Sequence, residues 1–274
     1  MVARMLARRG VESSANEARW IVESATGIGS EHLVLADSII DEEAAHRSIS
    51  MAKRRIAGEP LQYVTGTVGF RRIELAVGPG VFIPRPETEV VVERAADHLG
   101  EKGLVVDIGT GSGAIALALA DERPDAKVYA TERASEAIAW CRKNVDALGF
   151  NVDILEGDLF TPLPASLRQN IDVVVSNPPY VAENELAHLH REIIGYEPHE
   201  ALLAADGGLA MIERIGAEAR SWLKAGGWLV LEIGEGQGDR VRAELWAQGY
   251  ENVSIHPDLV GRDRIAEGQW NPPN

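Results

Sequence analysis

Apolar residues in the first third of the chain recur at the three- and four-residue spacing of amphipathic helices. This pattern predicts helices over Val2–Arg9, Ala15–Thr26 and Asp41–Ala57, separated by glycines. Asp41 is placed to cap the third helix, because its carboxylate can accept the free backbone N–H groups of the first turn. Acidic residues follow this cap and basic residues close the helix, an order that suits the helix dipole. We therefore predict a small helical domain over residues 1–65 that contains no strands.

The pattern changes between Tyr63 and Ile83, where apolar and polar residues alternate between glycines. Period-two alternation of this length predicts a short β-hairpin. Pro84 and Pro86 follow and fix the backbone at the entry to a helix that runs to about Leu99. We assign residues 66–86 to a β-hairpin linker between two domains.

From Leu104 onward, short apolar runs alternate with helical segments. Strands that are apolar on both faces indicate a parallel sheet covered by helices on both sides. Residues 87–274 are therefore predicted to form one doubly wound α/β domain, with Val253–His256 and Arg264–Glu267 added as edge strands. The other predicted strands are Leu104–Ile108, Lys127–Thr131, Val152–Leu155, Ile171–Ser176 and Trp228–Ile233, and the predicted helices are Ser112–Asp121, Ser135–Leu148, Leu209–Lys224 and Asp239–Gln248.

The composition is that of a soluble globular protein, with 274 residues of which 45% are hydrophobic and 25% are charged. At roughly 150 residues per domain, this length fits either one large domain or one medium domain and one small domain. The 27 basic and 42 acidic residues give a net charge of −15. Because so acidic a protein is poorly suited to coat polyphosphate, we expect no bulk nucleic-acid binding.

The chain holds a single cysteine, Cys141, which excludes an internal disulfide and a cysteine-rich zinc site. His188 and His190 are two residues apart, a spacing that places them on different faces of a helix, so we expect no metal site. The N-terminal residues lack the apolar core of a signal peptide, and no run of 18 apolar residues occurs. These features predict a cytoplasmic protein without a membrane-spanning segment.

The first strand of the α/β domain leads into the glycine-rich loop Asp107-Ile108-Gly109-Thr110-Gly111-Ser112-Gly113-Ala114, which opens a helix. Glycines at these positions allow a sharp turn and let the backbone approach a ligand closely. Glu132 ends the next strand, about 20 residues later, where a carboxylate accepts both hydroxyls of a ribose. The loop fits a variant of the dinucleotide fingerprint and also the first motif of S-adenosylmethionine methyltransferases, so it leaves both cofactors open.

The tetrapeptide Asn177-Pro178-Pro179-Tyr180 follows the fourth predicted strand and decides between these cofactors. Its prolines form a rigid turn with free carbonyls at the carboxyl edge of the sheet, where ligands bind. The Asn177 side-chain oxygen and the Pro178 carbonyl are two acceptors suited to a planar NH₂ group, and Tyr180 offers an aromatic face. Holding both N–H hydrogens positions a poorly nucleophilic nitrogen for in-line attack on a methyl group, and such positioning contributes up to roughly 7–11 kcal/mol. We predict Asn177, Pro178 and Tyr180 as catalytic, all four residues as substrate-binding, and no general base.

Two further segments lie in loops of this domain. After the third strand, Asp158 is placed to hydrogen-bond the exocyclic amine of an adenine and Leu159 to pack on its ring. A turn-capping role for Asp158 is nearly as well supported. Glu197, Pro198 and His199 form a loop that either walls the substrate site or is a plain surface loop.

Taken together, these motifs resemble the PrmC/HemK family, the methyltransferases that modify the glutamine of peptide-chain release factors. The resemblance covers nearly the whole chain and includes the helical N-terminal domain. The linker and the tetrapeptide in combination are highly specific, whereas DNA adenine methyltransferases similarly use the tetrapeptide alone on an exocyclic amine. The matching motifs are Phe82-Ile83-Pro84-Arg85-Pro86-Glu87-Thr88-Glu89, Asp107–Gly113, Asn177–Tyr180, Tyr196-Glu197-Pro198 and Asp258-Leu259-Val260-Gly261-Arg262-Asp263-Arg264.

The resemblance implies a Rossmann-like class I S-adenosylmethionine methyltransferase sheet. It implies that Asn177 contacts both cofactor and substrate amide, that Pro178 to Tyr180 shape a glutamine pocket, and that the helical domain grips the release factor. Glu132 stands where many relatives have Asp, a change that keeps the ribose-binding carboxylate. The implied cofactor-binding residues are Asp107, Gly109, Thr110, Gly111, Ser112, Gly113, Glu132, Asp158, Leu159 and Asn177.

We therefore expect S-adenosylmethionine-dependent methylation of the side-chain amide nitrogen of the glutamine in the Gly-Gly-Gln motif of peptide chain release factors. A DNA or RNA amino-methyltransferase is the nearest alternative and needs a cationic groove, against which the net charge of −15 argues. An NAD-dependent oxidoreductase leaves Asn177–Tyr180 unexplained. A non-catalytic nucleotide-sensing or adaptor module does not require that tetrapeptide.

Overall fold

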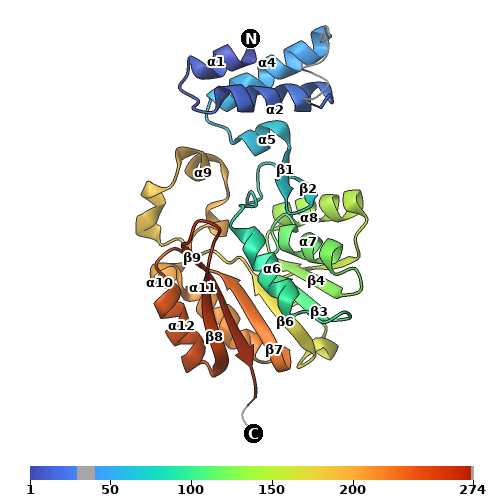
Figure 1. Cartoon of the computed structure of the whole chain (residues 1–274), viewed down its shortest axis with the longest axis vertical. Coiled ribbons are helices and arrows are strands. Elements are labelled where there is room, and N and C mark those ends of the chain that lie inside the picture. Colours follow the sequence, from blue (N-terminus) through green and yellow to red (C-terminus); the bar gives the residue numbers. More distant parts are fainter. Residues whose placement is uncertain (30–40, 273–274) are drawn as a thin grey trace.

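The computed structural model describes residues 1–29 and 41–272, which form a small helical domain and a larger α/β domain (Figure 1). The helical domain lies at one end of an elongated molecule and holds the N-terminus. Its helices are α1 (Val2–Ala7), α2 (Ser14–Thr26), α4 (Glu42–Ile56) and α5 (Leu61–Thr65).

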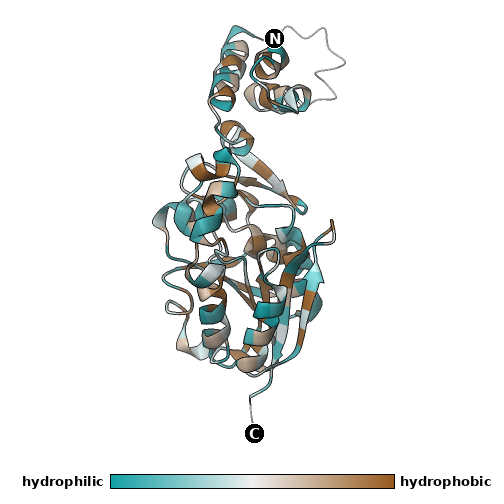
Figure 2. Ribbon diagram, turned by 90° about the vertical axis from the view of Figure 1, so that its left-hand side faces the viewer, coloured by the Kyte–Doolittle hydropathy of each residue, from teal (hydrophilic) through white to brown (hydrophobic). Residues whose placement is uncertain are grey.

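Hydrophobic and hydrophilic stretches alternate along the helices of this domain (Figure 2). Leu6, Ile21 and Ala52, each from a different helix, pack together in a buried apolar core. Asp41 caps α4, because its Oδ1 accepts the backbone N–H of Ala44 at 2.6 Å. The predicted cap of this helix is therefore confirmed.

A two-stranded antiparallel hairpin, β1 (Thr67–Phe70) and β2 (Ile73–Ala76), follows the helical domain. The alternating pattern that starts at Tyr63 is a strand only from Thr67 onward, because α5 occupies the residues before it. Gly66 ends α5 in the left-handed conformation, with a φ of 84°. Asn144 on α8 (Ser135–Leu148) anchors the hairpin by hydrogen-bonding both the N–H and the C=O of Ala76.

The α/β domain is built on one seven-stranded sheet. Its strands are β3 (Leu104–Ile108), β4 (Lys127–Glu132), β5 (Val152–Glu156), β6 (Ile171–Ser176), β7 (Leu223–Glu232), β8 (Tyr250–Pro257) and β9 (Asp263–Trp270). They lie in the order β5-β4-β3-β6-β7-β9-β8, with β3 to β7 parallel and β9 antiparallel to both of its neighbours. The strand order reverses between β3 and β6, which creates a crevice of the kind that binds ligands in α/β proteins.

Helices cover both faces of this sheet (Figure 1). On one face, α6 (Thr88–His98) and α7 (Ala114–Glu122) pack in the same core as Val105 and Val173. On the other face, α11 (Ala210–Ala219) and α12 (Gly238–Ala247) share a core with Val106 and Val174. Adjacent strand residues thus face opposite cores, which explains why these strands are apolar throughout. The predicted α/β class is confirmed.

Two predicted details of this domain are wrong. The helix predicted over Leu209–Lys224 ends at Ala219, because β7 already starts at Leu223. Leu223 pairs with Ile171 of β6, so a neighbouring strand rather than helical spacing determines this boundary. The strand predicted at Arg264–Glu267 is not at an edge: β9 folds back onto β7 and leaves β8 outside it.

The segment between β6 and α11 consists of short helical turns and connects the two domains. Its elements are η2 (Glu183–His188), α9 (Arg191–Tyr196), η3 (His199–Ala201) and α10 (Ala205–Gly208). Arg55 of α4 forms ion pairs with Glu17 of α2 at 2.6 Å and with Glu192 of α9 at 2.7 Å. The helical domain therefore contacts the α/β domain through this ion pair as well as through the hairpin.

Candidate active site

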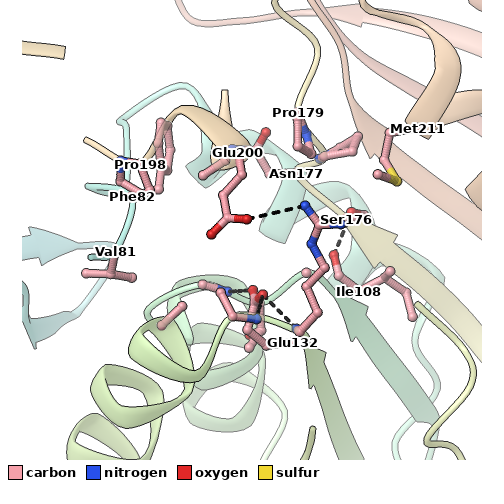
Figure 3. A pocket seen from close by; sticks show the side chains of 18 of the residues that line it. Val81, Phe82, Ile108, Glu132, Ser176, Asn177, Pro179, Pro198, Glu200 and Met211 are labelled. Atoms are coloured by element: carbon pink, nitrogen blue, oxygen red, sulfur yellow. Dashed lines mark hydrogen bonds and ion pairs between the residues drawn. The ribbon is translucent and has the colours of Figure 1, made fainter. Parts of the chain in front are cut away.

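A cavity opens at the carboxyl ends of β3, β4 and β6, where the strand order reverses (Figure 3). The glycine loop lines it, together with Glu132 at the end of β4 and the tetrapeptide Asn177–Tyr180 after β6. These motifs are far apart in the sequence. The fold brings them together in one site at the edge where parallel α/β sheets bind ligands.

The glycine loop turns sharply, because Gly109, Gly111 and Gly113 have φ angles of 70°, 59° and 88°. Residues with a Cβ atom rarely adopt such angles. A Cβ atom on Gly109 or Gly111 would meet no atom within 4 Å. A Cβ atom on Gly113 would lie 2.9 Å from Leu117 and 3.0 Å from Cys141. The first two glycines thus leave open space for a ligand, whereas the third allows the loop to pack against α7 and α8.

Asp107 and Gly113, at the two ends of the loop, do not line the cavity. Asp107 is 1% exposed, and its Oδ2 accepts the Thr110 hydroxyl at 2.5 Å and the Ala116 N–H at 3.2 Å. Burial raises the pKa of Asp107 to about 7, although these two hydrogen bonds lower it. Its Oδ1 has no hydrogen-bond partner among the residues that the structure describes. The structure therefore places Asp107 where it shapes the loop from within.

Backbone donors hold the Glu132 carboxylate at the cavity wall (Figure 3). Its Oε2 accepts the Gly111 N–H at 3.0 Å, and its Oε1 accepts the N–H groups of Arg133 and Ala134 at 2.8 and 2.9 Å. Each carboxylate oxygen has two lone pairs, so Oε1 is fully used by its two N–H donors and Oε2 retains a lone pair for a ligand hydroxyl. This carboxylate, next to the open space at Gly111, fits a cofactor that carries a ribose.

Asp158 and Leu159 also line the cavity. Asp158 forms an ion pair with Arg214 of α11 at 2.6 Å, and its side chain is 41% exposed. Leu159 is buried and takes the left-handed conformation with a φ of 46°. Arg214, which no sequence pattern indicated, therefore shares the Asp158 carboxylate with any ligand that approaches it.

The tetrapeptide lies against the cavity, and each of its residues lines it. Asn177 donates a hydrogen bond from Nδ2 to Thr88 Oγ1 at 3.1 Å. The Tyr180 hydroxyl donates to Glu232 at 3.0 Å. Burial, together with the neighbouring Glu232, raises the pKa of Tyr180, so its hydroxyl keeps the proton that it donates.

Thr88 and Glu232 are site residues that sequence analysis missed. Thr88 begins α6, Glu232 ends β7, and the Thr88 hydroxyl donates to Glu232 Oε2 at 2.6 Å. Both are almost fully buried. Burial raises the pKa of Glu232 to about 7, although hydrogen bonds from Thr88 and Tyr180 lower it. The available signal was an acidic residue at the carboxyl end of an apolar parallel strand, the edge at which ligands bind.

The loop after α9 is not a plain surface loop. Glu197 is 4% exposed, accepts the Ile83 N–H at 3.1 Å and forms an ion pair with Arg85. Pro198 lines the cavity, whereas His199 is exposed. The loop is therefore anchored to the linker through Glu197 and forms part of the cavity wall.

One ion pair joins two cavity-lining segments. Glu200 of η3 extends toward the segment at Glu132 (Figure 3) and approaches Arg133 to 3.5 Å. The Arg133 and Glu200 side chains are 53% and 60% exposed. Exposed ion pairs contribute about 0–1 kcal/mol, so this contact opposes the entry of a ligand only weakly.

Within residues 1–29 and 41–272, no group of His, Cys, Asp and Glu side chains is arranged to hold a metal ion. His188 ends η2 and His190 precedes α9. The helices of this described part of the chain are all too short or too polar to cross a membrane.

Solved structures show the fold of the α/β domain. The chain resembles a methyltransferase from Pyrococcus furiosus with a TM-score of 0.54 and 18% identity, over 83% of this chain and 98% of that one. It also resembles a 16S rRNA methyltransferase from T. thermophilus in complex with AdoMet and guanosine, with a TM-score of 0.55 and 19% identity over 74% and 49%. At these identities the likeness establishes the class I methyltransferase fold alone.

Sequence comparisons are more specific. Residues 1–66 match the family model of the PrmC N-terminal domain, and residues 78–226 match that of the Methyltransferase small domain. Release factor glutamine methyltransferases from Geobacter sulfurreducens and Escherichia coli are each 37% identical to this chain, over 96% and 94% of it and 92% and 93% of their own length. The Neisseria gonorrhoeae protein of the same name is 42% identical over 84% of this chain and 83% of its own. The chain belongs to the family of release factor glutamine methyltransferases.

Proposed function

We propose that this protein transfers a methyl group from S-adenosylmethionine to the side-chain amide nitrogen of the glutamine in the Gly-Gly-Gln motif of peptide chain release factors. The observation that carries the proposal is the position of Asn177 and Pro178 in the same cavity as the glycine loop. The family to which the chain belongs supports the same substrate. When bound, S-adenosylmethionine supplies a methyl group on a sulfonium, which is a good leaving group.

The tetrapeptide positions the nucleophile in this proposal. Asn177 Oδ1 and the Pro178 carbonyl accept the two N–H hydrogens of the glutamine amide, while Pro179 and Tyr180 shape its pocket. This arrangement holds the nitrogen toward the part of the cavity that the glycine loop lines. Positioning of this kind accounts for much of the rate of a two-reactant step, up to roughly 7–11 kcal/mol.

The cofactor site in this proposal consists of the glycine loop and the neighbouring strand ends. Glu132 binds the ribose, Leu159 contacts the adenine, and Asp158 accepts from its exocyclic amine in competition with Arg214. Asp107 and Gly113 act indirectly by maintaining the shape of the loop. The residues in contact with the cofactor are Gly109, Thr110, Gly111, Ser112, Glu132, Asp158, Leu159 and Asn177.

We assign residues 1–65 to recognition of the release factor, 66–86 to the linker and 87–274 to catalysis. The match of residues 1–66 to the PrmC N-terminal domain supports the first assignment. Release factors act in translation, so we place the protein in the cytoplasm. Its net charge of −15 supports a protein substrate rather than nucleic acid.

Methyl transfer from radiolabelled S-adenosylmethionine to a purified release factor tests this function. We expect label on the release factor and none on a Gln-to-Ala release factor or on an equal mass of adenine-containing DNA. Label on the DNA alone would overturn the substrate while keeping the cofactor. Binding of the cofactor without label on either would likewise overturn the release factor as substrate.

A variant at the tetrapeptide connects the reaction to the site. Asn177→Ala removes the acceptor for the substrate amide and should lower kcat/KM by roughly 10²–10³-fold. Asp239→Asn is the matched surface control, because its side chain is 96% exposed. Equal activity of both variants would contradict the assigned role of Asn177.

A further inference from the structure

Side chains from three parts of the α/β domain form one hydrogen-bonded chain beside the cavity. The Thr88 hydroxyl donates to Glu232 Oε2 at 2.6 Å, and the Tyr180 hydroxyl donates to Glu232 Oε1 at 3.0 Å. Asn177 donates from Nδ2 to Thr88 Oγ1 at 3.1 Å. Glu232 therefore holds both ends of the tetrapeptide, Tyr180 directly and Asn177 through Thr88.

The direction of each hydrogen bond follows from the charge of Glu232. An ionised carboxylate only accepts, so the hydroxyl hydrogen of Thr88 points at Glu232. Thr88 Oγ1 then offers lone pairs to Asn177, and only the NH₂ side of the amide can bind there. The amide oxygen of Asn177 takes no part in this chain, and among the described residues the only hydrogen bond of the Asn177 side chain is the one from Nδ2 to Thr88. Because Asn177 lines the cavity, this oxygen is available to a substrate.

We infer that Thr88 and Glu232 are positioning residues that orient the Asn177 amide and thereby make the site select an amide over a carboxylate, an inference that rests on the proposed function. With its oxygen available, Asn177 accepts a hydrogen bond from the NH₂ group of glutamine. Glutamate offers no N–H and would place an acceptor against an acceptor. Sites built to hydrogen-bond a substrate group reject the analogue that lacks it by about 10⁴-fold or more.

Protonation of Glu232 reverses the direction of the hydrogen bonds from Glu232 through Thr88 to Asn177. A neutral carboxyl group carries a proton that it can donate to Thr88, whose hydroxyl then donates to Asn177 and binds the amide oxygen. Burial raises the pKa of Glu232 to about 7; of the charged groups near it, Arg264 of β9 lowers this pKa and Glu87 before α6 raises it. The orientation that favours glutamine is therefore lost as the pH falls below about 7.

Variants of Thr88 test the positioning role. Thr88→Val keeps the shape of the side chain but removes the hydroxyl, and we expect kcat/KM for the release factor to fall roughly 10–100-fold while the cofactor Kd is unchanged. Thr88→Ser restores the hydroxyl and should restore the rate. Full activity of Thr88→Val, or failure of Thr88→Ser to recover it, would overturn the inference.

A pH profile provides a readout that a merely structural role would not change. Wild-type kcat/KM should fall on the acid side with a midpoint near pH 7, because the pKa of Glu232 is about 7. Asp107 in the cofactor loop also has a pKa of about 7, so both profiles are measured at saturating S-adenosylmethionine, where cofactor binding does not limit the rate. Glu232→Gln cannot titrate, so its profile under these conditions should lack this acid limb, whatever its absolute rate. An acid limb with the same midpoint in Glu232→Gln would overturn the inference.

A measurement independent of activity separates this inference from the proposed function. In the cofactor-bound, ¹⁵N-labelled protein, the side-chain NH₂ signal of Asn177 should titrate near pH 7 and should not titrate in Glu232→Gln. If the position of this signal does not change with pH in the wild type, the inference is overturned even if the release factor is methylated. A titrating signal in a protein that methylates no release factor would support the orientation and overturn the proposed function.

Discussion

The conformation of the cofactor loop requires a residue without a side chain at position 113. The loop enters α7 there with a φ of 88°, and an added Cβ atom would meet Leu117 and Cys141 at 2.9 and 3.0 Å. Gly113→Ala therefore has a conformational cost of about 1–2 kcal/mol and an overpacking cost of about 1–3 kcal/mol. We expect its free energy of unfolding, measured in urea, to fall by about 2–5 kcal/mol.

Gly111→Ala is the matched control for that variant. Gly111 has a φ of 59°, but a Cβ atom there meets nothing within 4 Å. It should therefore lose only the conformational part, about 1–2 kcal/mol. An equal decrease in the free energy of unfolding of the two variants would show that the contacts of the added Cβ atom with α7 and α8 do not destabilise the protein.

A site residue is predictable from sequence where its residue type and neighbours form a local signature. Repeated glycines after an apolar strand indicate a ligand-binding turn, and Asn-Pro-Pro-Tyr combines two prolines with an amide and an aromatic ring; both motifs line the cavity. Thr88 belongs to the linker motif and Glu232 is an acidic residue at the carboxyl end of an apolar strand, but neither position indicates that the two side chains meet. They are 144 residues apart, and each is an ordinary member of its helix or strand until the fold joins them.

Among the elements, the stability of α4 depends on the hydrogen bond that caps its N-terminus. Asp41 accepts the Ala44 N–H at 2.6 Å at the start of a helix of 15 residues. Removing such a cap costs about 1 kcal/mol, so we expect Asp41→Ala to lower the free energy of unfolding by about that amount. Asp41→Asn keeps the acceptor and should match the wild type. If Asn destabilises as much as Ala, the charge rather than the hydrogen bond is responsible.

Some elements were predictable to the residue and others were not. β6 (Ile171–Ser176) and α8 (Ser135–Leu148) agree with prediction at both ends, because their apolar patterns are bounded by clear turn residues. The turns between Glu183 and Ala201 are too short to show any periodicity. Contacts with the linker and the helical domain position them instead. The place of β9 inside the sheet depends on pairing with β7, which no local pattern reveals.

At the scale of the whole molecule, Arg55 connects the two domains through its ion pair with Glu192 of α9. Within the helical domain it also pairs with Glu17, and the side chains of Arg55 and Glu17 are only 10% and 11% exposed. Arg55→Met leaves Glu17 buried without its partner, so we expect the free energy of unfolding to fall by roughly 3–5 kcal/mol. Glu192→Gln should cost less than about 1 kcal/mol, because Glu192 is 42% exposed. A small loss in Arg55→Met would mean that water reaches Glu17.

The pH dependence of stability has a separate origin in Glu267 of β9. It accepts hydrogen bonds from Arg94 at 2.8 Å and His98 at 3.1 Å, and His256 lies 2.9 Å away. Burial alone would raise the pKa of Glu267, but these neighbours outweigh it and lower the pKa to about 2. An unfolded glutamate titrates near 4.3, so this carboxylate stabilises the fold above about pH 4 by roughly 3 kcal/mol. That contribution is lost as the pH falls toward 2.

Glu267→Gln removes this dependence. At pH 6 we expect it to be less stable than the wild type by roughly 3 kcal/mol, and this difference should shrink to about half by pH 3. Guanidinium denaturation at each pH measures both values. Asp97→Asn, which alters the exposed partner of Arg94, should show no such trend. A difference that stays constant with pH would contradict the assigned cause.

The burial of Cys141 has a consequence for observing this protein at work. Cys141 is 0% exposed, and burial raises the pKa of its thiol to about 12, so it offers neither the access nor the thiolate that alkylation requires. The chain contains no other cysteine. A cysteine introduced on the helical domain by Glu43→Cys, at a side chain that is 84% exposed, is then the one thiol that a maleimide dye modifies in the folded enzyme. The fluorescence of that dye can follow the arrival of a release factor without the removal of any native cysteine.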